Sequence, residues 1–218
     1  MEVIRKIVNQ ISPYMRSYGY KFSQKCFYWI QNDIAYCVQF DVPSSFVYAS
    51  FFIMPLYMPC KNRYYTYGNR ISSLYNSRLL PLPRAANDEE IEKWCTFLCY
   101  DLEDKVFPFW RKISTPKQLV NVVEQKGYST GPFFLCIPVQ ISRLEMFSYL
   151  YMEEFAKLSL VIQRYPQDVQ ISNSLTQTIR NSYLHESETV EQLMHEDVSE
   201  CRSFCTETIE DTLRKCFK

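Results

Sequence analysis

The stretch YKFSQKCFYWIQNDIAYCVQFDVPSSFVYASFFIMPLY, residues 20–57, decides the fold. Three apolar runs within it are rich in the aromatic and β-branched residues that favour strands. The runs cover residues 20–30, 34–42 and 46–57. Polar, turn-forming residues separate them at 31–33 and 43–45. Since short turns join antiparallel neighbours, the stretch predicts three consecutive antiparallel strands.

The alternation of side chains predicts how these strands face the core. In the middle run the apolar residues Ile34, Tyr36, Val38 and Phe40 share one face. The run from Phe46 to Met54 is apolar on both faces except for Ser50, which is typical of a strand that is covered on both sides. The run 20–30 is interpreted as one strand.

Helical patterns fill most of the remaining chain. Helices are predicted over 2–17, interrupted or ended around Ser12-Pro13; from Asn87 to about Phe107; from Thr115 to Gly127; over about 140–164 with an end at Pro166; and through most of 175–216. Because strands and helices do not alternate, a doubly wound parallel sheet is not expected. The prediction is an α+β fold with an antiparallel three- or four-stranded sheet packed by helices and a helical C-terminal part.

The polar residues 167–174 favour a boundary near residue 165. We therefore expect an α+β domain over 1–165 and a helical extension over 166–218 packed on it, with one domain overall as the alternative.

Composition restricts the compartment and the partner. Lys and Arg together number 24, as do Asp and Glu, so the chain lacks the basic excess of a protein whose main partner is nucleic acid. Its nine cysteines are scattered, and the N-terminal residues form no signal peptide, which predicts free thiols in a reducing cytoplasm. No apolar run approaches the length of a membrane span, so no membrane association is expected.

A cluster of cationic and aromatic residues follows the predicted sheet. It consists of Arg63, Tyr64, Tyr65, Tyr67 and Arg70. Arg and Tyr are enriched in binding patches because they combine apolar area with directional polar groups. The same residues could stack bases or hold phosphates. The alternative is a tyrosine-rich loop that covers one edge of the sheet.

Candidate chemical groups have simpler explanations. Two cysteine pairs have helical i, i+4 spacing: Cys95/Cys99 and Cys201/Cys205. With His195 nearby, the second pair could hold zinc. The alternative is that these thiols belong to the apolar core faces of their helices. His185 and His195 fall in a charged, solvent-facing helix pattern. The acidic groups Glu89-Glu90, Asp101/Glu103/Asp104 and Glu153-Glu154 are typical of helix starts and solvated faces. With 4 Gly in the chain no nucleotide-binding fingerprint exists, and we predict neither a cofactor nor metal ligands.

Several short motifs resemble those of a bacterial domain-of-unknown-function family. They are Gly19, Lys21, the pair Phe27-Tyr28, the pair Gln39-Phe40, Phe51, Arg78 and the segment VFPFWRKISTPKQLV at 106–120. The resemblance covers about residues 1–125. It implies an N-terminal helix followed by antiparallel strands, and it implies no activity, because that family is uncharacterised.

The functional prediction is a non-enzymatic cytoplasmic protein that binds another protein, of the immunity or adaptor type. The alternative is a hydrolase-type or metal-dependent enzyme that uses the Cys and His groups. The partner, the ligand and the oligomeric state are not specified by the sequence.

Overall fold

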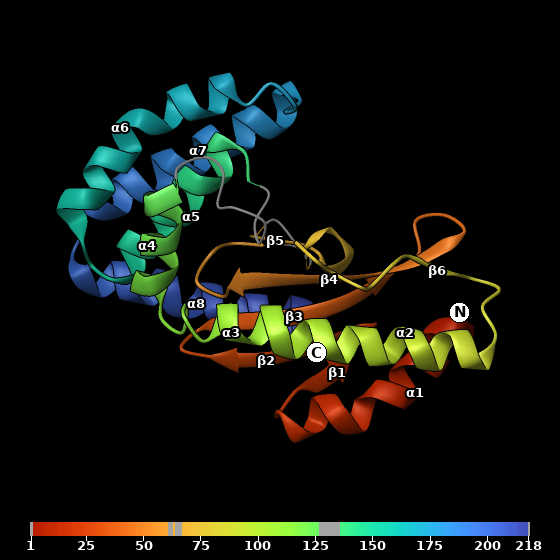
Figure 1. The fold of residues 1–218 in the computed structure, drawn as a ribbon. Coiled ribbons are helices and arrows are strands. Elements are labelled where there is room, and N and C mark those ends of the chain that lie inside the picture. The colour runs from red at the N-terminus through yellow and green to blue at the C-terminus, as the bar shows by residue number, and fades with distance from the viewer. Residues whose placement is uncertain (1, 61–62, 64–66, 127–135, 218) are drawn as a thin grey trace. The chain divides into compact units, whose positions relative to one another are not determined.

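The computed structural model describes residues 2–60, 63, 67–126 and 136–217, and it confirms an α+β fold with an antiparallel sheet and a helical C-terminal part (Figure 1). The strands are β1 (Lys21–Ser23), β2 (Cys26–Gln31), β3 (Ile34–Asp41), β4 (Phe46–Pro55), β5 (Tyr67–Arg70) and β6 (Leu82–Pro83). The helices are α1 (Glu2–Ser17), α2 (Asp88–Asp101), α3 (Phe107–Trp110), α4 (Pro116–Lys126), α5 (Pro138–Tyr151), α6 (Phe155–Ile171), α7 (Gln177–Met194) and α8 (Val198–Phe217). A 3₁₀ turn (Ile71–Ser73) follows β5, and a π-helical turn (Leu102–Val106) joins α2 to α3.

The chain divides into two compact units. The first unit contains the described residues of 2–54 and 67–114, that is the sheet with α1, α2 and α3. The second unit contains the described residues of 55–63, 115–126 and 136–217, that is α4 to α8 with the segment that follows β4. The predicted boundary near residue 165 stays a prediction.

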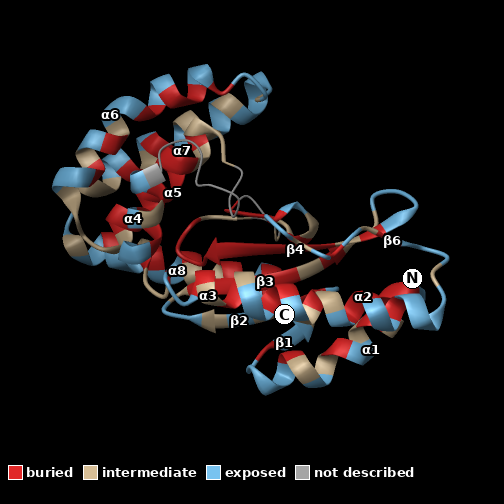
Figure 2. Cartoon of the chain, in the orientation of Figure 1, coloured by how far each residue is buried: buried red, intermediate tan, exposed pale blue. Residues whose placement is uncertain are grey.

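In the first unit the strands are ordered β1-β2-β3-β4-β5, and β6 also pairs with β4, so the sheet has more strands than the three or four predicted. The predicted face of β3 packs under α2 and α3: the Tyr36 ring lies 5.5 Å from Trp110, and the Phe40 ring lies 6.3 Å from Trp94. Figure 2 shows the buried residues that line β3 and β4. From Ala49 to Pro55, β4 is buried on both faces, as its sequence predicts, whereas Phe46 at its start is exposed.

The run 20–30, interpreted as one strand, is a hairpin. Gln24 and Lys25 have positive φ angles of 48° and 64° and form a two-residue turn between β1 and β2. The turn places Phe22 opposite Phe27 on the same face of the sheet. In one continuous strand these two side chains would point to opposite faces, because they lie an odd number of positions apart. The turn at Asn32-Asp33 has the same backbone and was predicted.

Two prolines do not end their helices. Pro13 lies inside α1, where Ile11 and Met15 are buried on either side of it, and Pro166 lies inside α6, next to the buried Tyr165. Burial of these flanking side chains offsets the hydrogen bond that each proline removes.

The predicted helix over 140–164 is two helices. α5 ends at Tyr151, and Glu153 adopts the left-handed backbone with φ 59°. The amide of Glu154 then donates to the carbonyl of Tyr149 at 2.9 Å, which is the bond that closes a Schellman cap. Glycine usually occupies that position, and with Glu153 there no local signal marks the break.

In the second unit, α5 is the central helix. Every residue from Ile141 to Leu150 is buried, and α4, α6, α7 and α8 each pack against it. A helix that is buried on all sides must satisfy its polar side chains internally. Glu145 accordingly pairs with Arg164 of α6, and Ser142 donates to Asp168.

Candidate functional site

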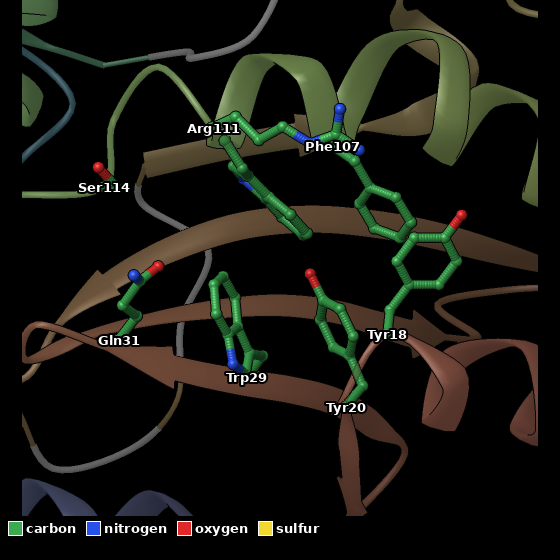
Figure 3. Close-up of a pocket in the computed structure, with 8 residues that line it drawn as sticks. Tyr18, Tyr20, Trp29, Gln31, Phe107, Arg111 and Ser114 are labelled. Atoms are coloured by element: carbon green, nitrogen blue, oxygen red, sulfur yellow. The ribbon is translucent and has the colours of Figure 1, made fainter.

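An aromatic cleft in the first unit is the best-formed candidate site (Figure 3). It encloses about 270 Å³. One side comes from the α1–β1 connection and β2, which contribute Tyr18, Tyr20, Trp29 and Gln31. The other side comes from α3 and the residues after it, which contribute Phe107, Trp110, Arg111 and Ser114. In Figure 3 the Tyr20 and Trp29 rings stand next to each other and face Phe107 and Arg111.

Local backbone geometry places each side chain in this cleft. Gly19 has a φ angle of 84°, which lets the chain turn sharply between Tyr18 and Tyr20. The strand alternation of β2 puts Trp29 and Gln31 on the same face. On the helical side, the π-helical turn widens the helix by one residue per turn before α3 begins.

Contacts between rings form the floor of the cleft. The Phe107 ring centroid lies 4.9 Å from that of Tyr18 and 5.8 Å from that of Tyr20, and Trp110 lies 6.3 Å from Tyr20. Tyr20, Phe107 and Trp110 are buried, whereas Tyr18 is 42 % and Trp29 37 % exposed. The floor is therefore assembled without a ligand, and two large rings remain open to solvent at the rim.

Hydrogen bonds hold the rim in place. The Tyr36 hydroxyl donates to the carbonyl of Ile113 at 2.7 Å, and the Asn32 side chain donates to the carbonyl of Ser114 at 2.9 Å. These bonds fix the chain after α3 against the β2–β3 hairpin. The Tyr18 hydroxyl donates to Glu103 at 3.0 Å.

Two phenols and one guanidinium determine the electrostatics of the cleft. The hydrogen bond to Glu103 raises the pKa of Tyr18, and burial raises the pKa of Tyr20, so both phenols stay neutral. Neither can act as a base or nucleophile near neutral pH. Arg111 is exposed and has no ion pair among the described residues, so it offers a cation to a ligand.

One polar atom in the wall of the cleft is unsatisfied. The indole N–H of Trp110 is buried and has no hydrogen-bond acceptor in the described structure. By contrast, the indole N–H of Trp94 donates to the carbonyl of Leu80 at 2.7 Å.

The predicted cluster of Arg63, Tyr64, Tyr65, Tyr67 and Arg70 does not line this cleft. Tyr64 and Tyr65 lie outside the described residues. Tyr67 is buried in β5, and the Arg70 guanidinium stacks 3.9 Å from the Tyr48 ring centroid. Arg63 belongs to the second unit, with its guanidinium 5.8 Å from the Phe217 ring. Binding through this cluster stays a prediction.

The helical cysteine pairs lie in apolar surroundings. Burial raises the pKa of Cys95 to about 12 and that of Cys99 to about 11. Burial likewise raises the pKa of Cys205 to about 12 and that of Cys201. Such thiols stay protonated at neutral pH. Throughout the described chain, no three His, Cys, Asp or Glu side chains form a group that could hold a metal ion.

The two histidines are exposed. His185 lies on α7 with its ring 3.4 Å from Glu188, and His195 caps the C-terminal end of α7. The structure gives neither histidine a cysteine or serine partner among the contacts of the described residues. They therefore do not form a catalytic pair in this geometry.

The acidic groups have structural partners. Glu90 and Asn87 form a capping box at the start of α2. Asp101 is buried, accepts a hydrogen bond from Ser77 at 2.7 Å and pairs with Lys105. Glu153 pairs with Arg202 through both carboxylate oxygens, at 2.6 and 3.0 Å.

No residue of the cleft was singled out as a site from the sequence. Its two sides are far apart along the chain: Tyr36 and Ile113, which hold them together, are separated by 77 residues. The segment 106–120 was noted only as part of a family resemblance.

Within the described residues, no helix has the length and apolar character needed to cross a membrane. The chain matches no protein-family model, no curated protein and no solved structure, and the family resemblance noted above stays a prediction.

Proposed function

We propose that this chain is a non-enzymatic, cytoplasmic interaction protein of the adaptor or immunity type, and that its aromatic cleft captures an anchor side chain of a partner protein. The observation that carries the proposal is the combination of two exposed rings, Tyr18 and Trp29, with a buried aromatic floor and the cation of Arg111, which forms no ion pair with the described residues. Partially exposed aromatic and Arg side chains around a pocket are typical of binding hot spots.

The size of the cleft favours a single anchor residue. Pockets for whole cofactors and drug-sized ligands usually enclose about 300–1,000 Å³, and this cleft encloses about 270 Å³. That volume suits one large aromatic or aliphatic side chain.

The charge of the cleft favours a carboxylate beside the anchor. Arg111 lies at the rim, Gln31 and Ser114 add polar atoms, and Glu103 is already bonded to Tyr18. A planar guanidinium binds a carboxylate through two parallel hydrogen bonds. The proposed epitope is therefore a large apolar side chain next to an Asp, a Glu or a C-terminal carboxylate.

The cytoplasmic part of the proposal is supported by the nine free cysteines of the chain. Thiols stay reduced in the cytosol, where glutathione and thioredoxin maintain them.

The test uses site-specific photo-crosslinking in the native cell. A photoreactive phenylalanine derivative is placed at Tyr18 and, as a matched control, at Tyr75, which is 80 % exposed in the same unit and outside the cleft. We expect one defined partner at position 18 that is absent at position 75. The Arg111→Glu variant should lose this adduct, whereas Arg84→Glu, a charge reversal at another exposed arginine of the unit, should keep it.

A second measurement tests the epitope with purified protein. N-acetyltryptophan, which carries a carboxylate, and its neutral amide are titrated while the NMR signals of the Trp29 indole are followed. The carboxylate should bind more tightly than the amide, and Arg111→Glu should remove the difference. Equal crosslinking at positions 18 and 75, together with binding that does not depend on Arg111, would contradict the proposal.

A further inference from the structure

A pair of thiols in the second unit lies in hydrogen-bond contact. Cys60, in the segment that follows β4, has its Sγ 3.5 Å from the Sγ of Cys216 near the end of α8. The Cys60 thiol also lies 3.6 Å from the hydroxyl of Thr212, one helical turn earlier on α8. Cys60 is half-buried, whereas Cys216 is buried.

The segment that carries Cys60 is held against α5. The Tyr57 ring stacks on Tyr151 with centroids 4.5 Å apart, and its hydroxyl lies 3.0 Å from that of Ser148. Arg143 donates to the carbonyl of Pro59 at 2.7 Å. The position of Cys60 opposite α8 is therefore set by contacts of the residues that precede it in the chain.

The surroundings of Cys60 favour its thiolate. The hydrogen bond from Cys216 lowers the pKa of Cys60 to about 7; burial opposes this, and Thr212, Arg143 and Lys215 add to it. The same hydrogen bond raises the pKa of Cys216, which keeps its proton and donates it.

Acidic side chains offset part of this positive charge. Glu186 pairs with Arg143 through both carboxylate oxygens, at 2.6 and 2.9 Å, and Asp211 pairs with Lys215. The hydrogen bond between the two thiols is the main source of thiolate character at Cys60, followed by the hydrogen bond with Thr212 and then by the cations.

Other cysteines of the chain are poor nucleophiles by comparison. Burial raises the pKa of Cys136 to about 12, as it does for Cys95 and Cys205. Cys99 has the same intermediate exposure as Cys60, but burial raises its pKa to about 11. Exposure alone therefore does not distinguish Cys60 from Cys99.

We propose that Cys60 and Cys216 form a peroxide-reactive dithiol in which Cys60 is attacked first and Cys216 resolves it to a disulfide. The Cys60 thiolate attacks one oxygen of hydrogen peroxide, an S–O bond forms, the O–O bond breaks, and hydroxide leaves. The sulfur of Cys216 then attacks the Cys60 sulfenic acid, an S–S bond forms, the S–O bond breaks, and the departing hydroxide takes the proton of Cys216. The two thiols lose two electrons, and peroxide is reduced to water.

The geometry needs little adjustment for the second step. A disulfide has its sulfurs about 2.05 Å apart, so these sulfur atoms must approach by about 1.5 Å from the observed 3.5 Å. The product would tie the segment after β4 covalently to the end of α8, two parts of the chain separated by 156 residues.

The first test measures which thiol reacts. The full-length reduced protein is treated with iodoacetamide at pH 7, and peptides are quantified by mass spectrometry over time. Cys60 should be modified about a hundredfold faster than Cys99, because its larger thiolate fraction outweighs its lower intrinsic nucleophilicity. A Cys99 rate equal to or above that of Cys60 would overturn the proposal.

The second test identifies the product. Treatment of the full-length protein with hydrogen peroxide should give a peptide in which Cys60 is joined to Cys216. The Cys216→Ser variant should instead accumulate a sulfenic acid at Cys60 that dimedone traps, and Cys60→Ser should give neither product. Cys99→Ser is the matched control and should leave the disulfide intact. A disulfide between other cysteines, or no oxidation at Cys60 when Cys99 is oxidised, would refute the assignment.

Discussion

A comparison of the two buried tryptophans of the first unit gives the free energy that one indole hydrogen bond contributes to stability. Trp94 and Trp110 are 5 % and 4 % exposed, and both pack among aromatic rings on the sheet. They differ at the indole nitrogen: that of Trp94 donates to Leu80, and that of Trp110 has no acceptor in the described structure. Substitution by Phe removes the same atoms at both positions, so the loss of apolar contact largely cancels in the comparison.

The difference between the two variants can be worked out from these contacts. Trp94→Phe removes a hydrogen bond worth about 1 kcal/mol. Trp110→Phe removes a buried donor that has no acceptor in the described structure and whose desolvation costs about 1–3 kcal/mol. Recovering this free energy offsets part of the destabilisation caused by the cavity that the smaller ring leaves. Since the Leu80 side chain is 73 % exposed, water can reach its carbonyl in the Trp94 variant and recover part of that loss. We expect Trp94→Phe to be more destabilising than Trp110→Phe by about 2 kcal/mol.

The assay is equilibrium unfolding in urea, followed by far-UV circular dichroism. If the free energy of unfolding falls by about 2 kcal/mol per M urea, the unfolding midpoints of the Trp94→Phe and Trp110→Phe variants should differ by about 1 M. The denaturant dependence must be the same for all variants, so that the change reports stability alone. Trp29→Phe serves as a control, because this ring is 37 % exposed and its loss should cost less than about 1 kcal/mol. Equal destabilisation at positions 94 and 110 would refute the reasoning, since it would mean that the Trp110 N–H has a partner in solution.

Three further predictions concern particular positions. A Cβ at Gly68 would lie 2.1 Å from the backbone oxygen of Phe51. Gly68→Ala should therefore lower the unfolding free energy of the first unit by about 3 kcal/mol, measured in urea. A loss below about 1 kcal/mol would mean that β5 can shift away from β4. Lys25 has a φ angle of 64°, a conformation that glycine adopts without strain. Lys25→Gly should raise the unfolding free energy by about 0.5–1 kcal/mol, because the strain energy that it removes exceeds the entropic stabilisation of the unfolded chain. A loss of stability would contradict the hairpin turn. The alkylation rate of Cys60 should rise with pH around a midpoint near 7, because the thiolate forms above its pKa. Cys216→Ala should move this midpoint upward, because alanine has no hydrogen-bond donor at this position; an unchanged midpoint would exclude that donor as the cause.

The sequence predicts elements wherever a local rule decides the outcome. The alternation from Ile34 to Phe40 identified β3 and its core face, and the pair Asn87 and Glu90 identified the start of α2. A helix was predicted to begin at Thr115, and the Thr115 hydroxyl accepts from the amide of Gln118 at 3.3 Å, next to the first residue of α4. In each case the residues that form the signal are within one turn or a few strand positions of one another.

The missed hairpin and the missed helix break occur where residues adopt backbone conformations that their types do not favour. Gln24, Lys25 and Glu153 all have positive φ angles, which cost a residue with a side chain about 1–2 kcal/mol and give no sequence signal of the kind that Gly or Asn gives. At Glu153 the carboxylate pairs with Arg202, which lies 49 residues further along the chain. Tertiary contacts of this kind are absent from a local pattern.

The cleft could not be predicted for a related reason. Its rings are ordinary core residues in the sequence, and only the turn at Gly19 and the fold of the first unit bring Tyr18 and Trp29 to the same surface as Phe107. The composition indicates only that some aromatic rings are partly exposed, since the chain has 17 Tyr and 15 Phe, and it does not indicate which rings these are.

The two parts of the cleft would contribute differently to recognition. The rings of Tyr20, Phe107 and Trp110 hold one another in place before any ligand arrives, so an incoming side chain gains apolar contact without ordering the floor. Aromatic side chains have few rotatable bonds, which keeps the entropy cost at the rim low as well. Arg111, in contrast, is an exposed cation whose interaction weakens as salt increases. The rings would thus determine how long an anchor stays bound, and Arg111 would determine which anchors are accepted.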